Sequence, residues 1–102
     1  MVYTGSKSVA NAGTRVALAS ARTMADWVIV QANQATAGGQ PANTGAIYLG
    51  DKTVAAANGQ ILQSGDGFLY PVVAGATMYN LAEIYIDADT NGNAVRFLYG
   101  RK

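Results

Sequence analysis

The chain contains no cysteine and no histidine among its 102 residues. The lack of cysteine excludes disulfides, zinc sites built on thiolates and cysteine nucleophiles. The lack of histidine removes the commonest general base and the commonest transition-metal ligand, and with them any ordinary serine triad. The six acidic residues nearly all lie beside predicted turns or strand ends, where carboxylates are normally solvated or cap backbone groups. We therefore expect a protein that is not an enzyme and that needs no cofactor.

Charge is also scarce, since only 13% of the residues are charged and the net charge is +1. Nucleic-acid binding requires a concentrated basic patch, whereas the only adjacent basic pair here is Arg101 and Lys102. No apolar run approaches the roughly 18 residues of a transmembrane helix. Residues 1–8 also lack the basic region and apolar stretch of a signal peptide. The sequence therefore predicts no nucleic-acid partner, no membrane partner and synthesis in the cytoplasm.

What the chain does contain is a dense series of turn signals separated by short apolar runs. The pairs Gly38-Gly39, Asn58-Gly59 and Asn91-Gly92 are typical of turns. Short strands between such turns favour a sandwich or a barrel over a fold of alternating strands and helices. We predict one all-β domain over residues 14–102, a jelly-roll-like antiparallel β-sandwich of about eight strands. Residues 1–13 are predicted to form an N-terminal arm.

The predicted strands follow from short segments rich in β-branched and aromatic residues. They cover residues 15–19, 26–32, 46–49, 53–56, 60–62, 68–73, 83–87 and 94–99. Asn58-Gly59 predicts a two-residue hairpin turn, and Pro71, which has no N–H, predicts an edge strand or a bulge. A helix over residues 16–27 is the alternative for that alanine-rich segment, and residues 33–42 are expected to form a surface loop.

Alternation along the strands separates a core face from an outer face. In residues 26–32, Trp27 and Ile29 share one face, and we expect Trp27 to be a core residue. The last two strands flank a polar turn, and we predict that they form a closing hairpin. Its core residues are expected to be Ile84, Ile86, Val95, Phe97 and Tyr99.

The turn between these last two strands carries a metal-like pattern. Asp87, Asp89 and Asn91 place oxygen ligands at alternate positions ahead of Gly92, as in the first half of a calcium-binding EF-hand loop. The second half is missing, because Leu98 stands where the loop requires a bidentate glutamate. Asp and Asn also bond their own backbone in turns, and Gly supplies positive φ. We therefore predict a structural turn, with Asp87, Asp89 and Asn91 as the candidate ligands of a weak cation site.

Four residues are candidates for contact with a partner. Tyr48 and Tyr85 alternate with aliphatic residues in their strands, so they point outward if those aliphatics form the core. Exposed tyrosine suits a protein interface, stacking on a sugar or ordinary cross-strand packing. Val2 and Tyr3 are apolar anchors in the predicted arm, for which the sequence leaves two alternatives open: ordering on contact with a partner, or plain disorder.

Four segments taken in order resemble a recurrent small β-domain of tailed-bacteriophage structural proteins. They are ADWVIVQA at residues 25–32, NTGAIYLGD at 43–51, GQILQSGDGFLY at 59–70 and LAEIYIDADTNGNAVRFLY at 81–99. The resemblance spans about residues 14–100 and rests on the order of the four segments. Domains of this family serve as capsid decoration (cement) proteins, as bases of head fibres and as modules of tail proteins.

The resemblance implies a virion structural protein with no catalytic residues. A small stand-alone sandwich is more similar to a decoration protein than to a fibre base. Such a protein would bind the major capsid protein on the outer capsid surface, and homo-oligomers such as trimers would match capsid symmetry. The alternatives are a tail, neck or head-fibre module and a small glycan-binding module that uses Tyr48 and Tyr85.

Overall fold

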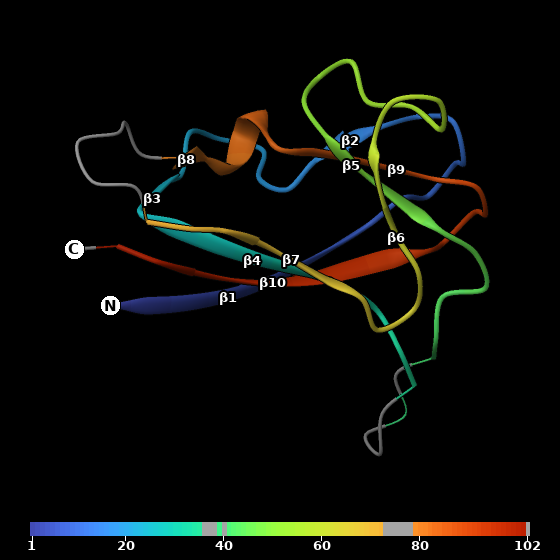
Figure 1. The fold of residues 1–102 in the computed structure, drawn as a ribbon, viewed down its shortest axis with the longest axis horizontal. Helices are drawn as coiled ribbons and strands as arrows, with labels where there is room; N and C mark the ends of the chain where they lie inside the picture. Colours follow the sequence, from blue (N-terminus) through green and yellow to red (C-terminus); the bar gives the residue numbers. More distant parts are fainter. Residues whose placement is uncertain (36–38, 40, 73–78, 102) are drawn as a thin grey trace.

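The computed structural model describes residues 1–35, 39, 41–72 and 79–101, and the fold is all-β (Figure 1). The described part of the chain contains one short 3-10 helix, η1 (Leu81–Glu83), and no α-helix. The strands are β1 (Val2–Ser8), β2 (Val16–Ala17), β3 (Met24–Ala25), β4 (Trp27–Ala32), β5 (Ile47–Gly50), β6 (Gln60–Leu62), β7 (Gly67–Tyr70), β8 (Tyr79–Asn80), β9 (Tyr85–Ala88) and β10 (Ala94–Gly100).

The strands form two four-stranded antiparallel sheets and one small two-stranded sheet. Sheet A has the order β1-β10-β4-β7, sheet B has the order β2-β9-β5-β6, and β3 pairs with β8. Sheet A occupies the lower part of Figure 1 and sheet B the upper right, and the start of β1 and the end of β10 both lie at the left. The prediction of an all-β, sandwich-like fold is confirmed, although the two sheets do not close on each other.

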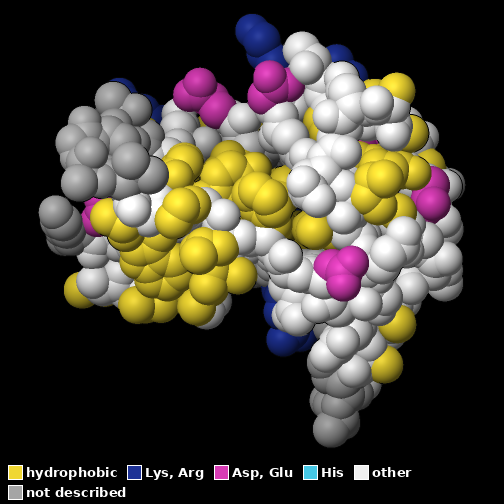
Figure 2. Space-filling model, viewed as in Figure 1, with side chains coloured by type: hydrophobic (Ala, Val, Ile, Leu, Met, Phe, Trp, Pro, Cys, Tyr) yellow, Lys and Arg dark blue, Asp and Glu magenta, His cyan; other side chains and the backbone are white. Residues whose placement is uncertain are grey.

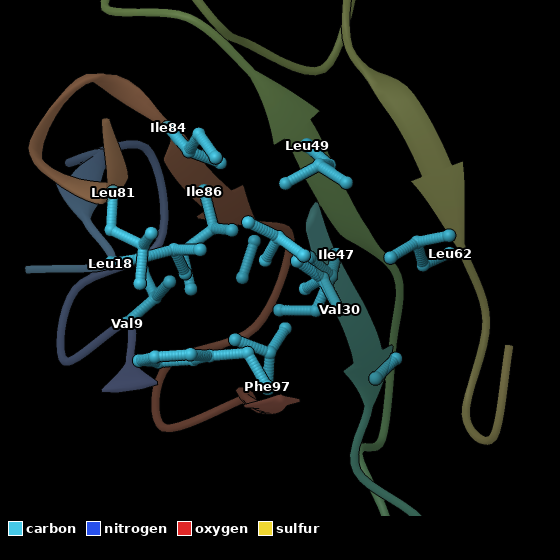
Figure 3. Close-up of a cluster of buried hydrophobic side chains, with 14 of the residues drawn as sticks. Val9, Leu18, Val30, Ile47, Leu49, Leu62, Leu81, Ile84, Ile86 and Phe97 are labelled. Atoms are coloured by element: carbon cyan, nitrogen blue, oxygen red, sulfur yellow. The ribbon is translucent and has the colours of Figure 1, made fainter. Parts of the chain in front are cut away.

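The core lies between the inner faces of the two sheets. Sheet B contributes large aliphatic side chains, among which Ile47 and Ile86 are completely buried. Figure 3 shows these side chains converging on Val30 and Phe97, which project from sheet A. The expected C-terminal core residues are confirmed: Ile84, Ile86, Val95 and Phe97 are buried, and Tyr99 is half-buried against the cluster.

The predicted closing hairpin is wrong. β9 pairs with β2 and β5 in sheet B, whereas β10 pairs with β1 and β4 in sheet A. The polar segment between them therefore carries the chain from one sheet to the other. Inward-facing Ile86 and Val95 are both buried, so each strand contributes to the same core from opposite sides. Turn composition reports where the chain turns and does not report which strands pair afterwards.

The predicted core position of Trp27 is also wrong. On β4 the buried residues are Val28, Val30 and Ala32, whereas Ile29 on the other face is 39% exposed. The cause lies in the neighbouring strands. Val30 lies between Phe97 and Phe68 on the neighbouring strands, and these two large rings leave room between them only for a small side chain such as valine. Trp27 is half-buried on the outer face instead, against Gly100, where a side chain would meet the indole ring.

Part of the predicted N-terminal arm is a strand. Val2–Ser8 pair along their whole length with β10, so this segment is an edge strand of sheet A.

Three further local predictions concern a helix, a hairpin turn and a proline. No helix forms in residues 16–27, which hold β2 and β3. Asn58-Gly59 does not join two strands directly, because β6 pairs with β5 and the segment before Asn58 is a turn. The edge-strand prediction for Pro71 is confirmed, since β7 ends just before it at the border of sheet A.

The Asn-Thr-Gly segment that precedes β5 holds the two sheets together. The Asn43 side chain behaves like a short piece of strand: its Nδ2 donates to the carbonyl of Ala94 at 2.8 Å, and its Oδ1 accepts from the Ala94 N–H at 2.9 Å. The backbone N–H of Thr44 donates to Oδ1 of buried Asn93 at 3.2 Å. Much of the predicted loop at residues 33–42 is described, and positions 36–38 and 40 lie outside the described residues.

Candidate functional site

The described residues bring together no group of three or more acidic side chains that could hold a metal ion. Nor is any helix in the described ranges long and apolar enough to cross a membrane. The candidate sites are therefore the polar segment 87–93 and the outer faces of the two sheets.

Asp87 serves as a structural acceptor in the position where the sequence suggested a cation ligand. Its carboxylate is buried, and Oδ1 accepts hydrogen bonds from the backbone N–H groups of Gly13 at 3.0 Å and Ala88 at 2.8 Å. Gly13 has a φ of +87°, a left-handed conformation that glycine adopts without strain. Asp87 therefore fixes the loop between β1 and β2 against β9.

Asn91 and Asp89 do not share a site with Asp87. Asn91 Oδ1 accepts the Ala12 N–H at 2.7 Å, and Asp89 Oδ1 accepts the Thr90 hydroxyl at 3.1 Å. A backbone hydrogen bond lies beside the bond between Asn91 and Ala12, since Gly92 N–H donates to the Val9 carbonyl at 2.7 Å. The three candidate ligands thus each hold a separate part of the segment, and two of them bind the loop that precedes β2.

Replacing Asp87 tests this structural role. We expect Asp87→Ala to lower the free energy of unfolding by about 1–2 kcal/mol, because two backbone donors lose a charged acceptor in a buried position. Asp87→Asn keeps an Oδ1 acceptor and should cost about half as much. Urea denaturation measures both values. Added calcium should leave the midpoint of the wild-type protein unchanged, and a clear rise with calcium would contradict the structural reading.

The four candidate interface residues lie on three different faces. Val2 is 59% exposed and points to the outer face of sheet A, while neighbouring Tyr3 points to the inner face and stacks on Tyr99 with ring centroids 5.2 Å apart. Tyr48 and Tyr85 lie on the outer face of sheet B, as predicted. The structure therefore brings only Tyr48 and Tyr85 together among these four residues.

Tyr48 and Tyr85 are diagonal neighbours on adjacent strands. Tyr48 lies opposite Asp87, and Tyr85 lies opposite Gly50, which presents no side chain. Diagonal positions of this kind are within reach of aromatic side chains. Both tyrosines are half-buried, so this pair offers a modest aromatic surface.

A second exposed apolar surface lies on the outer face of sheet A. Leu98, Ile29 and Leu69 stand side by side on β10, β4 and β7, and Leu69 is 53% exposed. We call these three residues the apolar row. Thr4 of β1 continues the row at one end, beside an open groove of about 620 Å³. Figure 2 shows one group of hydrophobic side chains at the left and centre of the molecule, where sheet A, β3 and β8 lie, and another at the upper right, where sheet B lies.

Sequence reasoning missed the apolar row. Alternation in residues 26–32 separates two faces, and the sequence predicts that the face with Trp27 and Ile29 is the core face. Leu69 and Leu98 lie in runs that are apolar at nearly every position, so alternation gave no indication of their direction. The one available signal is that residues 26–32 carry apolar side chains on both faces, a pattern that indicates a strand covered on both sides.

The inner face of sheet A holds an aromatic cluster that includes Tyr70. The Tyr70 ring packs edge-on against Phe68 at 5.1 Å and Tyr79 at 5.3 Å. Burial, with a smaller contribution from the charge of Tyr79, raises the pKa of Tyr70 above its ordinary value of 10.0. The folded protein therefore holds this proton more tightly than the unfolded chain does.

This pKa shift predicts a loss of stability in alkaline solution. Above the unfolded pKa of Tyr70, the unfolded state binds fewer protons than the folded state, so the free energy of unfolding falls as the pH rises. The loss should begin near pH 10 and continue up to the pKa of the folded protein. Tyr70→Phe should reduce this slope, which urea denaturation at several alkaline pH values measures. An unchanged slope would contradict the prediction.

No protein-family model, curated protein or solved structure matches this chain.

Proposed function

We propose that this chain is a structural protein of a tailed-phage virion, a decoration protein that binds the outer surface of the capsid. The proposal rests on the ordered resemblance of residues 25–99 to the phage β-domain, and the all-β, sandwich-like fold agrees with it. The observation that carries the binding role is the apolar row of Ile29, Leu69 and Leu98, which crosses three strands of one sheet face. The scarcity of charge suits close contact with another protein surface.

The mechanism is stabilisation of the assembled capsid by mass action. A protein that binds the assembled shell and not its free subunits stabilises the assembled state by RT ln(1 + c/Kd) per site, where c is its free concentration and Kd its dissociation constant. The apolar row would be buried against neighbouring capsid subunits, so that their separation would expose it to water again. Burial of apolar surface favours such contact by about 25 cal/mol per Å² before the costs of association are subtracted.

Electron microscopy of virions that carry a labelled copy of the chain tests the proposal. Label distributed over the capsid is the expected result. Label on the tail, neck or head fibres alone would overturn the decoration role and favour the alternative structural module.

Two matched substitutions then test which face binds. Leu69→Asp places a charge in the apolar row and should reduce capsid occupancy at least tenfold. Ile61→Asp is the control, because Ile61 is 52% exposed and lies on the outer face of sheet B, beside Tyr48. A loss of occupancy with Ile61→Asp and not with Leu69→Asp would move the contact to sheet B.

The Tyr48–Tyr85 pair favours a second candidate function, glycan binding. Two neighbouring rings on a sheet face can stack against the apolar faces of a sugar. Binding on a glycan array that is lost in both Tyr48→Ala and Tyr85→Ala would support this function over capsid decoration.

A further inference from the structure

The strand β1 presents a free backbone edge whose direction follows from its pairing with β10. Met1 and Arg101 exchange two hydrogen bonds, of 2.8 and 3.0 Å, so they form a hydrogen-bonded pair. Such pairs alternate along an antiparallel ladder, and Val9 N–H donating to Asn93 agrees with the same alternation. The odd-numbered residues of β1 therefore bond to β10. The even-numbered residues direct their N–H and C=O groups away from the sheet, and all of them are exposed: Val2, Thr4, Ser6 and Ser8.

This edge differs from the other strand edges of the molecule. Proteins protect edges by making them short or by adding proline and charge. β2 has two residues, β6 has three, and β7 has four and is followed by Pro71. β1 has seven residues, contains no proline, and carries a single charge at Lys7. In the described part of the chain, β1 pairs with β10 alone.

The sequence of β1 is complementary to itself in one antiparallel register. If Gly5 lies opposite Gly5 of a second copy, all seven residues overlap and the even-numbered residues form the hydrogen-bonded pairs. Thr4 then faces Ser6 of the other copy, and Val2 faces Ser8. On the inner face, Lys7 lies opposite Tyr3 of the other copy, which is an attractive cation–aromatic pair and keeps the two lysines apart.

Gly5 also suits the centre of this arrangement. The Phe97 ring of β10 lies over the Gly5 position on the inner face, so a large aromatic ring covers the glycine in the way that stabilises glycine in a strand. At the centre of a two-fold axis, two opposed glycines let the strands approach without a clash of side chains.

We propose that β1 is a homodimerisation edge: two copies pair their β1 strands antiparallel about Gly5 and join their A sheets into one continuous sheet. The pairing is isologous, so it closes on itself and does not propagate into fibres. It satisfies the outward N–H and C=O groups of Val2, Thr4, Ser6 and Ser8 in both copies. This proposal concerns the isolated protein and does not depend on the capsid role.

Concentration-dependent size and hydrogen exchange test the proposal directly. Analytical ultracentrifugation of the wild-type protein, up to the millimolar range, should show a monomer–dimer equilibrium. Amide exchange by NMR should show protection of Thr4, Ser6 and Ser8 that grows with concentration, while Tyr3 and Gly5 are protected throughout. A protein that stays monomeric over the whole series would overturn the proposal, as would a dimer in which exchange at Thr4 and Ser6 stays fast.

Substitutions on the outward-facing residues test the edge and its register. Thr4→Pro removes one outward N–H without removing a bond to β10, so it should weaken dimerisation at least tenfold and leave thermal unfolding of the monomer cooperative. A double variant, Thr4→Lys with Ser6→Lys, places like charges opposite each other and should also be monomeric. Its matched partner, Thr4→Glu with Ser6→Lys, places opposite charges in the same positions and should dimerise, more weakly at high salt. Equal dimerisation of the two double variants would overturn the register.

Discussion

Ile86→Ala should lower the free energy of unfolding by about 3–4 kcal/mol, the largest effect that we expect from a single substitution in this chain. Ile86 is completely buried on β9, at the centre of sheet B, where Val16 and Leu49 lie on either side of it. Removal of its side chain loses the transfer free energy of the deleted groups and leaves a cavity between two sheets that cannot both move inward. In a domain of 102 residues this is a large part of the total stability.

Ile61→Ala is the matched control for this prediction. Ile61 has the same side chain in the same sheet, but it is 52% exposed on the outer face of β6. We expect its replacement to cost less than about 1 kcal/mol, because little apolar surface is returned to water. Urea denaturation of both variants gives the comparison. Similar losses for the two would mean that the inner face of sheet B is not the main core surface.

The positions of most strands could be predicted from the sequence, because a strand needs only a short run of suitable residues. Which face of each strand lies in the core could not be predicted in the same way. Alternation along β4 separates Trp27 and Ile29 from Val28 and Val30, and both sets are apolar. The choice depends on Phe68 and Phe97, which flank Val30 from strands about forty and seventy residues away along the chain. The sizes of the side chains on three neighbouring strands therefore decide which face of β4 is buried, because the hydrophobicity of β4 itself does not distinguish its two faces.

Strand pairing is the second property, after the choice of the buried face, that local sequence patterns do not predict. The segment 87–93 has the composition of a hairpin turn, yet β9 and β10 enter different sheets. Two of its side chains, those of Asp87 and Asn91, accept hydrogen bonds from the loop before β2 and not from an opposite strand. The strand β1 carries no local signal for a related reason, because an edge strand held by backbone hydrogen bonds needs few large apolar side chains.

The same distinction between local and long-range information applies to the candidate site residues. The outward direction of Tyr48 and Tyr85 could be predicted, since regular alternation on β5 and β9 places aliphatic residues on the opposite face. The apolar row could not, because its three members come from strands that are distant in sequence and meet only through the register of sheet A. A surface assembled from several strands carries no local pattern, whereas a pair of outward tyrosines does.

Gly5→Ala should lower the free energy of unfolding by about 3 kcal/mol, although it adds a single methyl group. A Cβ at this position would lie 2.6 Å from Cε2 of Phe97, closer than carbon atoms can approach. Phe97 is only 9% exposed and packs within the core, so its ring cannot turn away without displacing its neighbours. Either β1 separates from β10 or the core rearranges, and both cost free energy. Chemical denaturation of dilute monomer measures the loss apart from any dimerisation.

Gly67→Ala is the control on the opposite edge of sheet A, and we expect it to change stability in the other direction. The nearest atom to a Cβ at Gly67 is the Val30 carbonyl oxygen at 3.7 Å, which is an ordinary contact. Alanine there restricts the unfolded chain without strain in the folded state, a gain of about 0.5 kcal/mol. The two substitutions are chemically identical and both lie on edge strands, so opposite signs would isolate the contact between Gly5 and Phe97 as the cause. Equal effects would contradict the close packing of β1 on the core.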